Sequence, residues 1–259
     1  MKQLLIDAGN SRLKWATLRA GRVGRVWAMG WTSASAGRVA RRVMAANSEV
    51  ARIMVCSVAG AVLERELRRA ARGANLVAPL FIRSTRRAAG VRNGYQDTWR
   101  LGADRWVALI GARALAPQRA LCVVDIGTAL TIDLLDAAGR HRGGLIVPGP
   151  ALMVESLLAG TAGIRRRARQ ARPRRPQGWA GSVFGRSTQA GLLAGSELAA
   201  AALIERTMLE ARTLLGSRPR LLVAGGGIAA VMARLTLSAT RVDDLVLHGL
   251  GVLAAGESG

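Results

Sequence analysis

The chain contains an internal repeat, and this feature constrains its fold more than any other. Residues 4–14 (LLIDAGNSRLK) align without gaps to residues 122–132 (CVVDIGTALTI), and the register continues to residues 20–22 against 138–140. Each copy has an apolar run, an Asp-x-Gly turn, a second run and a Gly-containing turn, which predicts a strand hairpin. A repeat of this length is too long for a solenoid unit and indicates a duplicated domain.

We therefore expect two similar half-domains, residues 1–117 and 118–259. The rest of the chain alternates between hydrophobic patterns typical of strands and those typical of helices, which predicts an α/β fold with sheets covered by helices. The expected helices are 35–47, 61–72, 103–115, 151–158, 188–215, one from about 228 and one opened by residues 243–244; the expected strands include 52–58, 77–83, 143–149 and 220–224.

The strong positive charge has two interpretations. The net charge is +22, and a surface of this kind attracts phosphates on nucleotides or on nucleic acid. However, all 38 basic residues but two are arginines spread through nearly every segment, and only 3% of residues are aromatic. Few aromatic side chains means few platforms on which the bases of a single strand could stack. We favour a general coding bias toward arginine and expect no specific nucleic-acid partner.

One segment is unusually basic. Residues 165–175 contain seven arginines, with Pro173 among them, and we expect a solvated connection there rather than a nucleic-acid arm. Two cysteines lie in apolar runs and the two histidines have no second ligand type close by, so a zinc site is not expected.

The sequence predicts a cytoplasmic protein that does not enter a membrane. A carboxylate, Asp7, stands where a signal peptide needs an apolar run. No uncharged apolar stretch reaches the roughly 18 residues that a membrane span requires.

The first copy of the repeat has the chemistry of a phosphate site. Asp7 follows a buried strand, Gly9 permits close backbone approach, and Asn10 and Ser11 supply short hydrogen-bonding side chains. A carboxylate beside such a turn can hold a hydrated divalent cation. An Asp-x-Gly sequence is also an ordinary turn, so the prediction depends on its duplication at Asp125.

A third glycine turn, residues 224–227 (AGGG), lies between an expected strand and a helix, where a nucleoside could lie against the backbone. The chain has no Gly-x4-Gly-Lys-Ser/Thr sequence, which argues against a P-loop enzyme.

Together these motifs resemble the superfamily of acetate and sugar kinases, Hsp70 and actin, and within it the type III pantothenate kinases. The residues that carry the resemblance are, in the order of the family, Leu101-Gly102-Ala103-Asp104-Arg105-Trp106, Asp125-Ile126-Gly127-Thr128-Ala129, Gly143-Gly144 with Pro148-Gly149, Phe184-Gly185-Arg186-Ser187-Thr188 and Leu247-His248-Gly249-Leu250. The match runs from Leu4 to Leu253. One departure is visible: the Tyr-x-Asn-Pro of the family is Tyr95-Gln96-Asp97-Thr98 in this chain.

The resemblance implies a fold and a reaction. The fold is α/β, with duplicated ribonuclease H-like (actin-like ATPase) half-domains whose mixed sheets are flanked by helices. The reaction is the ATP-dependent phosphorylation of pantothenate to 4′-phosphopantothenate, the first step of coenzyme A biosynthesis. The cofactors are ATP with magnesium and a monovalent cation, potassium or ammonium, and the enzyme is a homodimer.

The resemblance also implies roles for individual residues. Asp104 is the general base, and Asp125 binds the monovalent cation. Asp7 also helps to hold the magnesium ion that is bound to the ATP phosphates. The ATP-binding set is Asp7, Ala8, Gly9, Asn10, Ser11, Arg12, Leu13, Lys14 and Thr128; the pantothenate-binding set is Tyr95, Gly102, Ala103, Asp104, Arg105 and Thr188, the last acting across the dimer interface.

Four of these residues also have a plain structural interpretation. Asp104 and Arg105 could be a helix N-cap and a surface ion pair, Tyr95 a buried aromatic residue, and Thr188 the residue that starts a helix. Residues 196–215 are apolar on more than one helical face, which fits an internal core helix as well as a dimer interface.

Two other functions remain open. The chain could be an actin-fold kinase of another small hydroxyl compound, or a basic regulatory protein that keeps the fold and binds nucleic acid. Three acidic residues placed for phosphate chemistry, Asp7, Asp104 and Asp125, argue against a pure binding module.

Overall fold

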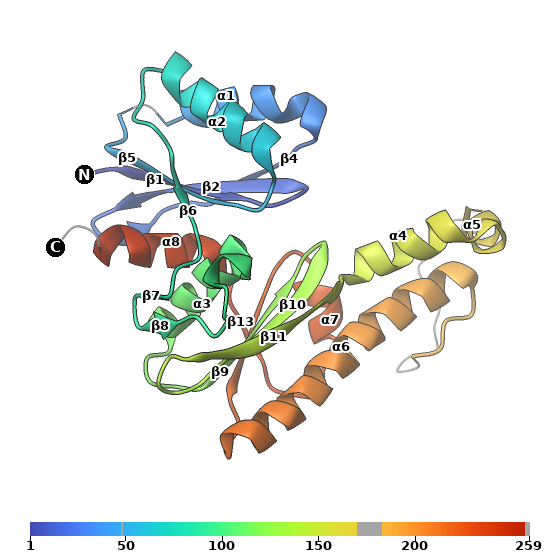
Figure 1. Ribbon diagram of the computed structural model, residues 1–259. Helices are drawn as coiled ribbons and strands as arrows, with labels where there is room; N and C mark the ends of the chain where they lie inside the picture. Colours follow the sequence, from blue (N-terminus) through green and yellow to red (C-terminus); the bar gives the residue numbers. More distant parts are fainter. Residues whose placement is uncertain (48, 170–182, 257–259) are drawn as a thin grey trace. The chain divides into compact units, whose positions relative to one another are not determined.

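The computed structural model of the chain describes residues 1–47, 49–169 and 183–256 (Figure 1). It separates into two compact units, and neither is one continuous segment. The first unit comprises residues 1–121, 135–143 and 243–259, and the second comprises 122–134 and 144–242. The half-domain boundary that the repeat predicts between residues 117 and 118 stays a prediction. The compact units are divided differently, since the C-terminal residues 243–259 group with the N-terminal unit.

The first unit is built on a mixed sheet of order β3-β2-β1-β5-β6, with β4 also paired to β2. β1 runs antiparallel to β2 and parallel to β5. The strands and helices of this unit are β1 (Gln3–Ala8), β2 (Arg12–Arg19), β3 (Arg22–Val23), β4 (Trp27–Gly30), α1 (Ala36–Ala45), β5 (Arg52–Ser57), α2 (Ala61–Gly73), β6 (Leu80–Ile82), β7 (Arg87–Ala88), β8 (Val91–Arg92), α3 (Ala103–Leu115) and α8 (Leu245–Gly256).

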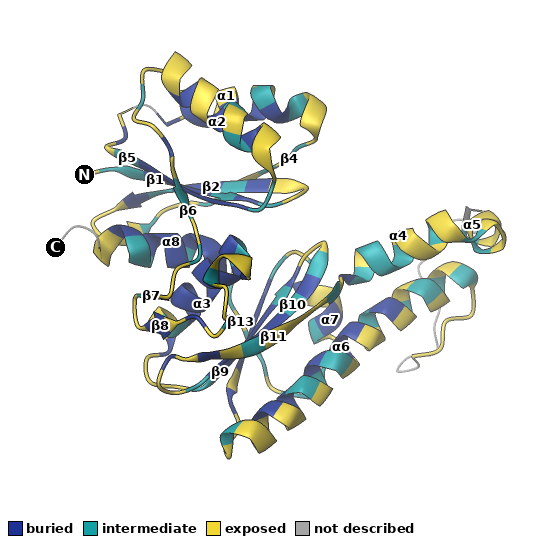
Figure 2. Ribbon diagram, in the orientation of Figure 1, coloured by how far each residue is buried: buried dark blue, intermediate teal, exposed yellow. Residues whose placement is uncertain are grey.

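One face of this sheet packs against α1 and α2. The two helices are amphipathic: α1 buries Val39, Val43 and Met44 at helical spacing, and its arginines lie on the exposed side (Figure 2). Leu4, Ile6 and Ala8 of β1 contribute to the same core. Because side chains alternate along a strand, Leu5 and Asp7 lie on the other face, where α8 packs against β1 and β5.

The second unit has a sheet of order β11-β10-β9-β12-β13. If β4 is set aside, both sheets place their strands in the same order of chain appearance, third, second, first, fourth and fifth, which confirms the duplicated α/β fold. Its elements are β9 (Leu121–Ile126), β10 (Ala129–Leu135), β11 (His141–Pro148), α4 (Pro150–Gly160), α5 (Ala162–Arg169), α6 (Thr188–Leu215), β12 (Arg220–Ala224), α7 (Ile228–Met232) and β13 (Thr240–Arg241). The end residues 121 and 135 and the first part of β11, residues 141–143, group with the first unit.

The basic segment differs from the expectation in the part that the structure describes. We expected a solvated connection from Arg165, but residues 162–169 form helix α5. Arginine is a good helix former, and the Arg165 guanidinium donates hydrogen bonds to the carbonyls of Leu158 and Ala159 at the end of α4. Residues 170–175 lie outside the described part of the chain.

Helix α6 has one buried face and one exposed face. Its bounds are those predicted from the sequence, and Ser187 caps it by accepting a hydrogen bond from the Ala190 amide at 3.1 Å. Ala200, Ile204 and Met208 are buried in the unit. None of the helices in the described ranges is long and apolar enough to cross a membrane.

Candidate active site

The turn after β1 is an exposed polar loop held by a hydrogen bond within its own backbone and by Trp31. Gly9 N–H donates to Arg12 O at 3.0 Å, and the indole N–H of Trp31 donates to Gly9 O at 2.9 Å. Asn10, Ser11 and Arg12 are exposed, so their side chains and the local amides can meet a ligand. The phosphate-binding role of this turn stays a prediction.

Three members of the predicted ATP-binding set have restricted side chains. Ala8 and Leu13 are fully buried, so only their backbone groups could reach a phosphate. The Lys14 ammonium forms an ion pair with Asp244 at 2.8 Å, and both side chains are about three-quarters buried (25% and 23% exposed). The ammonium has three N–H donors, so Lys14 could bind a phosphate and keep this partner. The pair could not be predicted from the sequence, since the two residues lie at opposite ends of the chain.

Asp7 and Asp104 act on the same buried position. Cys56 is adjacent to Asp7 across the parallel strand pair β1–β5 and is fully buried. Burial first, and then the carboxylates of Asp7 and Asp104, raise the pKa of the Cys56 thiol well above its usual range, while Arg83 acts in the opposite direction. The two carboxylates that the sequence assigned to phosphate and to catalysis therefore both act on the Cys56 thiol, and both belong to the first unit.

Asp104 stands in the first turn of α3, whose N-cap is Gly102. Its carboxylate accepts a hydrogen bond from the Arg105 amide at 2.8 Å. The alternative of an N-cap with a surface ion pair is therefore wrong: Gly102 caps the helix, and the Arg105 side chain is buried, with 6% exposed.

Arg105 and Tyr95 meet in the same region. The Arg105 guanidinium donates to the Tyr95 hydroxyl at 3.2 Å and lies 5.8 Å from the centre of its ring. The backbone at Tyr95 is held by Asn93, whose side-chain oxygen accepts a hydrogen bond from the Tyr95 amide at 2.9 Å. The structure thus brings together Asp104, Arg105 and Tyr95 of the predicted pantothenate-binding set, with Gly102 and Ala103 beside them in the chain.

In the second unit, the Asp125 turn is buttressed on two sides. The Gly149 amide donates to Thr128 O at 2.8 Å, and the Gly227 amide donates to Ile126 O at 2.9 Å. The glycine turn that the sequence assigned to a nucleoside therefore lies directly against the Asp125 turn.

The contact at Gly225 is so close that only glycine fits. Its φ is +101°, and a Cβ there would lie 2.3 Å from Asp125 Oδ1 and 2.5 Å from Ile126 O. Within the described residues, no three His, Cys, Asp or Glu side chains are arranged to hold a metal ion.

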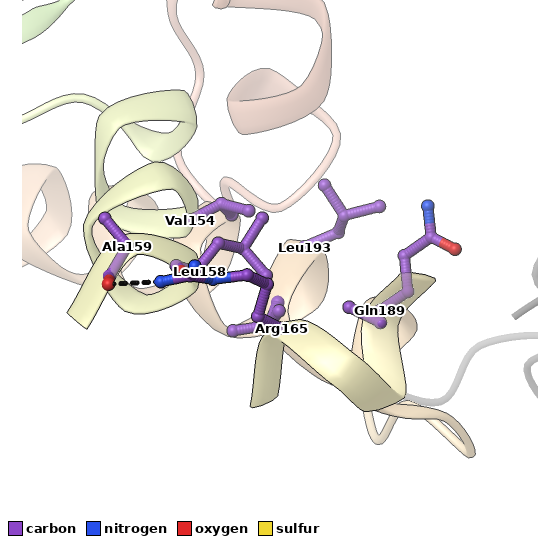
Figure 3. A pocket seen from close by; sticks show the side chains of 8 residues that line it. Val154, Leu158, Ala159, Arg165, Gln189 and Leu193 are labelled. Carbon is purple, nitrogen blue, oxygen red and sulfur yellow. Dashed lines mark hydrogen bonds between the residues drawn. The ribbon is translucent and has the colours of Figure 1, made fainter. Parts of the chain in front are cut away.

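Thr188 is the first residue of α6, directly after the capping Ser187. Near the same end of that helix lies a pocket of about 520 Å³ between α4, α5 and α6 (Figure 3). It is lined by Val154, Leu158, Ala159, Arg165, Ala168, Gln189, Leu192 and Leu193. None of these residues belongs to the predicted catalytic or binding sets.

Many known proteins are similar in sequence to this chain. The family model "Type III pantothenate kinase" matches residues 3–210. The type III pantothenate kinase of Aromatoleum aromaticum is 39% identical over 253 residues, covering 97% of each chain, and that of Halorhodospira halophila is 38% identical over 257 residues, covering 96% of each.

Solved structures resemble the fold at much lower identity. The activator of 2-hydroxyisocaproyl-CoA dehydratase from Clostridium difficile, with bound ADPNP, has a TM-score of 0.55 at 13% identity and covers 100% of this chain and 97% of its own. A ROK family glucokinase from Streptomyces griseus, in complex with glucose and AMPPNP, has a TM-score of 0.53 at 10% identity with complete coverage of both chains (100%). These likenesses confirm the actin-like fold class, and the sequence matches show that the chain belongs to the type III pantothenate kinase family.

Proposed function

We propose that the chain transfers the γ-phosphoryl group of ATP to the primary hydroxyl of pantothenate, with Asp104 as the general base. Family membership supports the reaction, which makes 4′-phosphopantothenate for coenzyme A biosynthesis. The observation that supports the assignment of residues is that one unit holds Asp7 and Asp104, which both act on the Cys56 thiol, together with the hydrogen-bonded pair of Arg105 and Tyr95.

Phosphoryl transfer depends mainly on positioning and on neutralising charge, with a base to accept the hydroxyl proton. Asp104 suits that base because the amide of Arg105 orients its carboxylate at the start of a rigid helix. Arg105 and Tyr95 would bind pantothenate beside it, with Gly102 and Ala103 shaping the pocket.

The exposed turn from Asp7 to Lys14 would hold the phosphates of ATP. Magnesium fits this donor set, since it is commonly bound by one or two carboxylates together with phosphates and waters, and Asp7 supplies a half-buried carboxylate. Magnesium would supply neutralisation of the phosphate charge.

Asp125 would bind a monovalent cation, potassium or ammonium, and Thr128 would contact the nucleotide. Support comes from the oxygen atoms of this turn, because Asp125 Oδ1 and the backbone oxygen of Ile126 lie side by side against Gly225. Hard cations prefer oxygen ligands of this kind.

A homodimer would bring Thr188 to the substrate site of the neighbouring subunit. Support comes from the exposed face of α6, where small and apolar residues recur at helical spacing; they are Gly191, Gly195, Leu198, Ala202 and Leu209. Leu209 is 59% exposed, and a twofold interface would cover this row with its own copy. The cytoplasmic location and the absence of a specific nucleic-acid partner stay predictions.

The test is an ATP-consumption assay of the purified protein across a panel of small hydroxyl compounds that includes pantothenate. We expect turnover with pantothenate, and a loss of about 10²–10⁴-fold in Asp104→Asn with ATP binding retained. Asp97→Asn is the matched control, because Asp97 is 56% exposed and pairs with Arg100 at the surface. Near wild-type turnover in Asp104→Asn would remove Asp104 from the catalytic role, and turnover with another compound in place of pantothenate would change the substrate.

A further inference from the structure

His141 packs on the residue that the proposed function places in the pantothenate pocket. The imidazole is buried, with 3% exposed, and stacks on the Tyr95 ring with the centres 5.7 Å apart and the planes 17° from parallel. Stacked rings of this separation attract one another beyond the effect of burial. His141 is not part of the predicted site, and no motif in the sequence singles it out.

The loop that carries Tyr95 is also fixed to the backbone of His141. A Cβ on Gly94 would lie 2.0 Å from His141 O and 2.9 Å from its carbonyl carbon, so the chain passes over His141 in direct contact. Asn93 is itself buried, and its side-chain amide donates to Thr98 O at 3.1 Å. The backbone on either side of Tyr95 therefore has little freedom, and its ring can settle only where His141 and Arg105 allow.

The three side chains form a continuous arrangement within the first unit. The Tyr95 ring contacts His141 through its face, and its hydroxyl accepts a hydrogen bond from Arg105, which comes from α3. Figure 1 shows β8, which leads into the Asn93–Tyr95 loop, beside α3, and the two elements are in contact. Removing the imidazole would let the Tyr95 ring turn into the vacated space. The Tyr95 hydroxyl would then move away from Arg105, which would lose this hydrogen-bond acceptor.

We propose that His141 is a positioning residue that sets the Tyr95 ring, and through it the Arg105 guanidinium, for binding of the pantothenate substrate. The inference rests on the proposed function for the identity of the substrate, but the coupling of His141 to Tyr95 can be measured without it. A misplacement of about 1 Å in a binding group can cost up to about 10²-fold.

The kinetic test compares His141→Leu with His141→Phe. Leucine removes the ring, whereas phenylalanine keeps a flat ring for Tyr95 to stack on. We expect His141→Leu to raise the KM for pantothenate about tenfold, the order of an aromatic pair's contribution, while kcat and the KM for ATP stay within about twofold. His141→Phe should recover most of the loss, which a general loss of stability would not explain.

Two further variants sharpen the comparison. The double variant with both Tyr95→Leu and His141→Leu should have nearly the same KM for pantothenate as Tyr95→Leu alone, because His141 acts through the Tyr95 ring. Trp27→Leu is the control. It removes a surface aromatic ring whose centre lies 4.2 Å from the Arg25 guanidinium carbon, and we expect no change in the KM for pantothenate.

A second readout does not depend on activity. Tyr95 is the single tyrosine of the chain, so protein made with ring-¹³C tyrosine gives one set of ring signals. These signals should move in His141→Leu and stay close to wild type in His141→Phe and Trp27→Leu. If wild type phosphorylates pantothenate but its KM is unchanged in His141→Leu, the proposal is overturned.

The two failures are separable. If wild type does not use pantothenate, the proposed function fails, and the tyrosine signals decide the positioning claim. Unchanged signals in His141→Leu refute it, whereas signals that move in His141→Leu and return toward wild type in His141→Phe support it for whatever substrate occupies the site. Equal impairment of the leucine and phenylalanine variants would also refute it, because stacking would then not be the cause.

Discussion

Replacing Gly225 with alanine should disturb the Asp125 turn specifically. The added Cβ would lie 2.3 Å from Asp125 Oδ1 and 2.5 Å from the backbone oxygen of Ile126. A side-chain carboxylate can rotate away, but the carbonyl is part of β9 and can move only with the strand. The φ of +101° adds strain that no rearrangement of neighbours removes, because it belongs to the alanine itself.

The expected cost follows from these two terms. A residue with a side chain in a sparsely populated backbone region costs roughly 1–3 kcal/mol, before any clash is counted. In a chain of this size, 1 kcal/mol corresponds to about 2–4 °C in Tm, so Gly225→Ala should melt about 2–12 °C below wild type. Gly226→Ala is the control: a Cβ there meets nothing within 4 Å, and its stability should stay within about 0.5 kcal/mol of wild type.

The assay joins thermal melting to nucleotide titration. If the Asp125 turn contributes to the nucleotide site, Gly225→Ala should also bind an ATP analogue more weakly than wild type does, in calorimetry with magnesium and potassium present. Equal melting temperatures for the two variants would refute the steric argument. A lower melting temperature with unchanged affinity would keep the steric argument and remove the turn from nucleotide binding.

Three shorter predictions concern other parts of the chain. Activity should rise with potassium or ammonium and respond weakly to sodium, and Asp125→Ala should lose this response; equal rates in sodium and potassium buffers would contradict the cation site. Leu209→Arg should lower both dimer formation in sedimentation and activity, whereas Val62→Arg, at a 39% exposed position of α2, should change neither; a fully active wild-type monomer would exclude the shared site. Burial raises the pKa of Cys122 to about 12 and that of Cys56 well above its usual range, so both thiols stay protonated at pH 8, and iodoacetamide should label the folded protein far more slowly than the urea-unfolded one; equal labelling rates would contradict this burial.

The features that could be predicted from the sequence are those encoded locally. The bounds of α3 and α6 follow from helical periodicity and from signals at their ends, and both agree with the structure. The duplicated hairpin was visible because each copy repeats strand, turn and strand within a short segment. Short strands such as β4 and β7 were not predicted, since two to four residues carry too little pattern to distinguish a strand from a loop.

The parts of the site that could not be predicted depend on contacts between distant residues. The stacking of His141 on Tyr95 and the ion pair of Lys14 with Asp244 join segments that share no pattern, and a single sequence holds no signal for them. Helix α5 was missed for another reason. A run of arginines suggests a solvated segment, but arginine favours helices, and Arg165 gains hydrogen bonds from the end of α4 that composition cannot reveal.

Duplication has given the chain two turns of one topology and two different physical characters. The first turn exposes Asn10, Ser11 and Arg12, and its carbonyls are held by Trp31, whose indole N–H donates to Gly9 O and whose amide donates to Ser11 O. The second carries no charged residue after its aspartate, and amides from two other segments hold its carbonyls. An exposed turn with polar side chains can adjust to the phosphates of a ligand, whereas a buttressed turn keeps its oxygens fixed, which favours a site of defined size for an ion. The proposed roles, phosphates at the Asp7 turn and a monovalent cation at Asp125, follow this physical difference between the two copies.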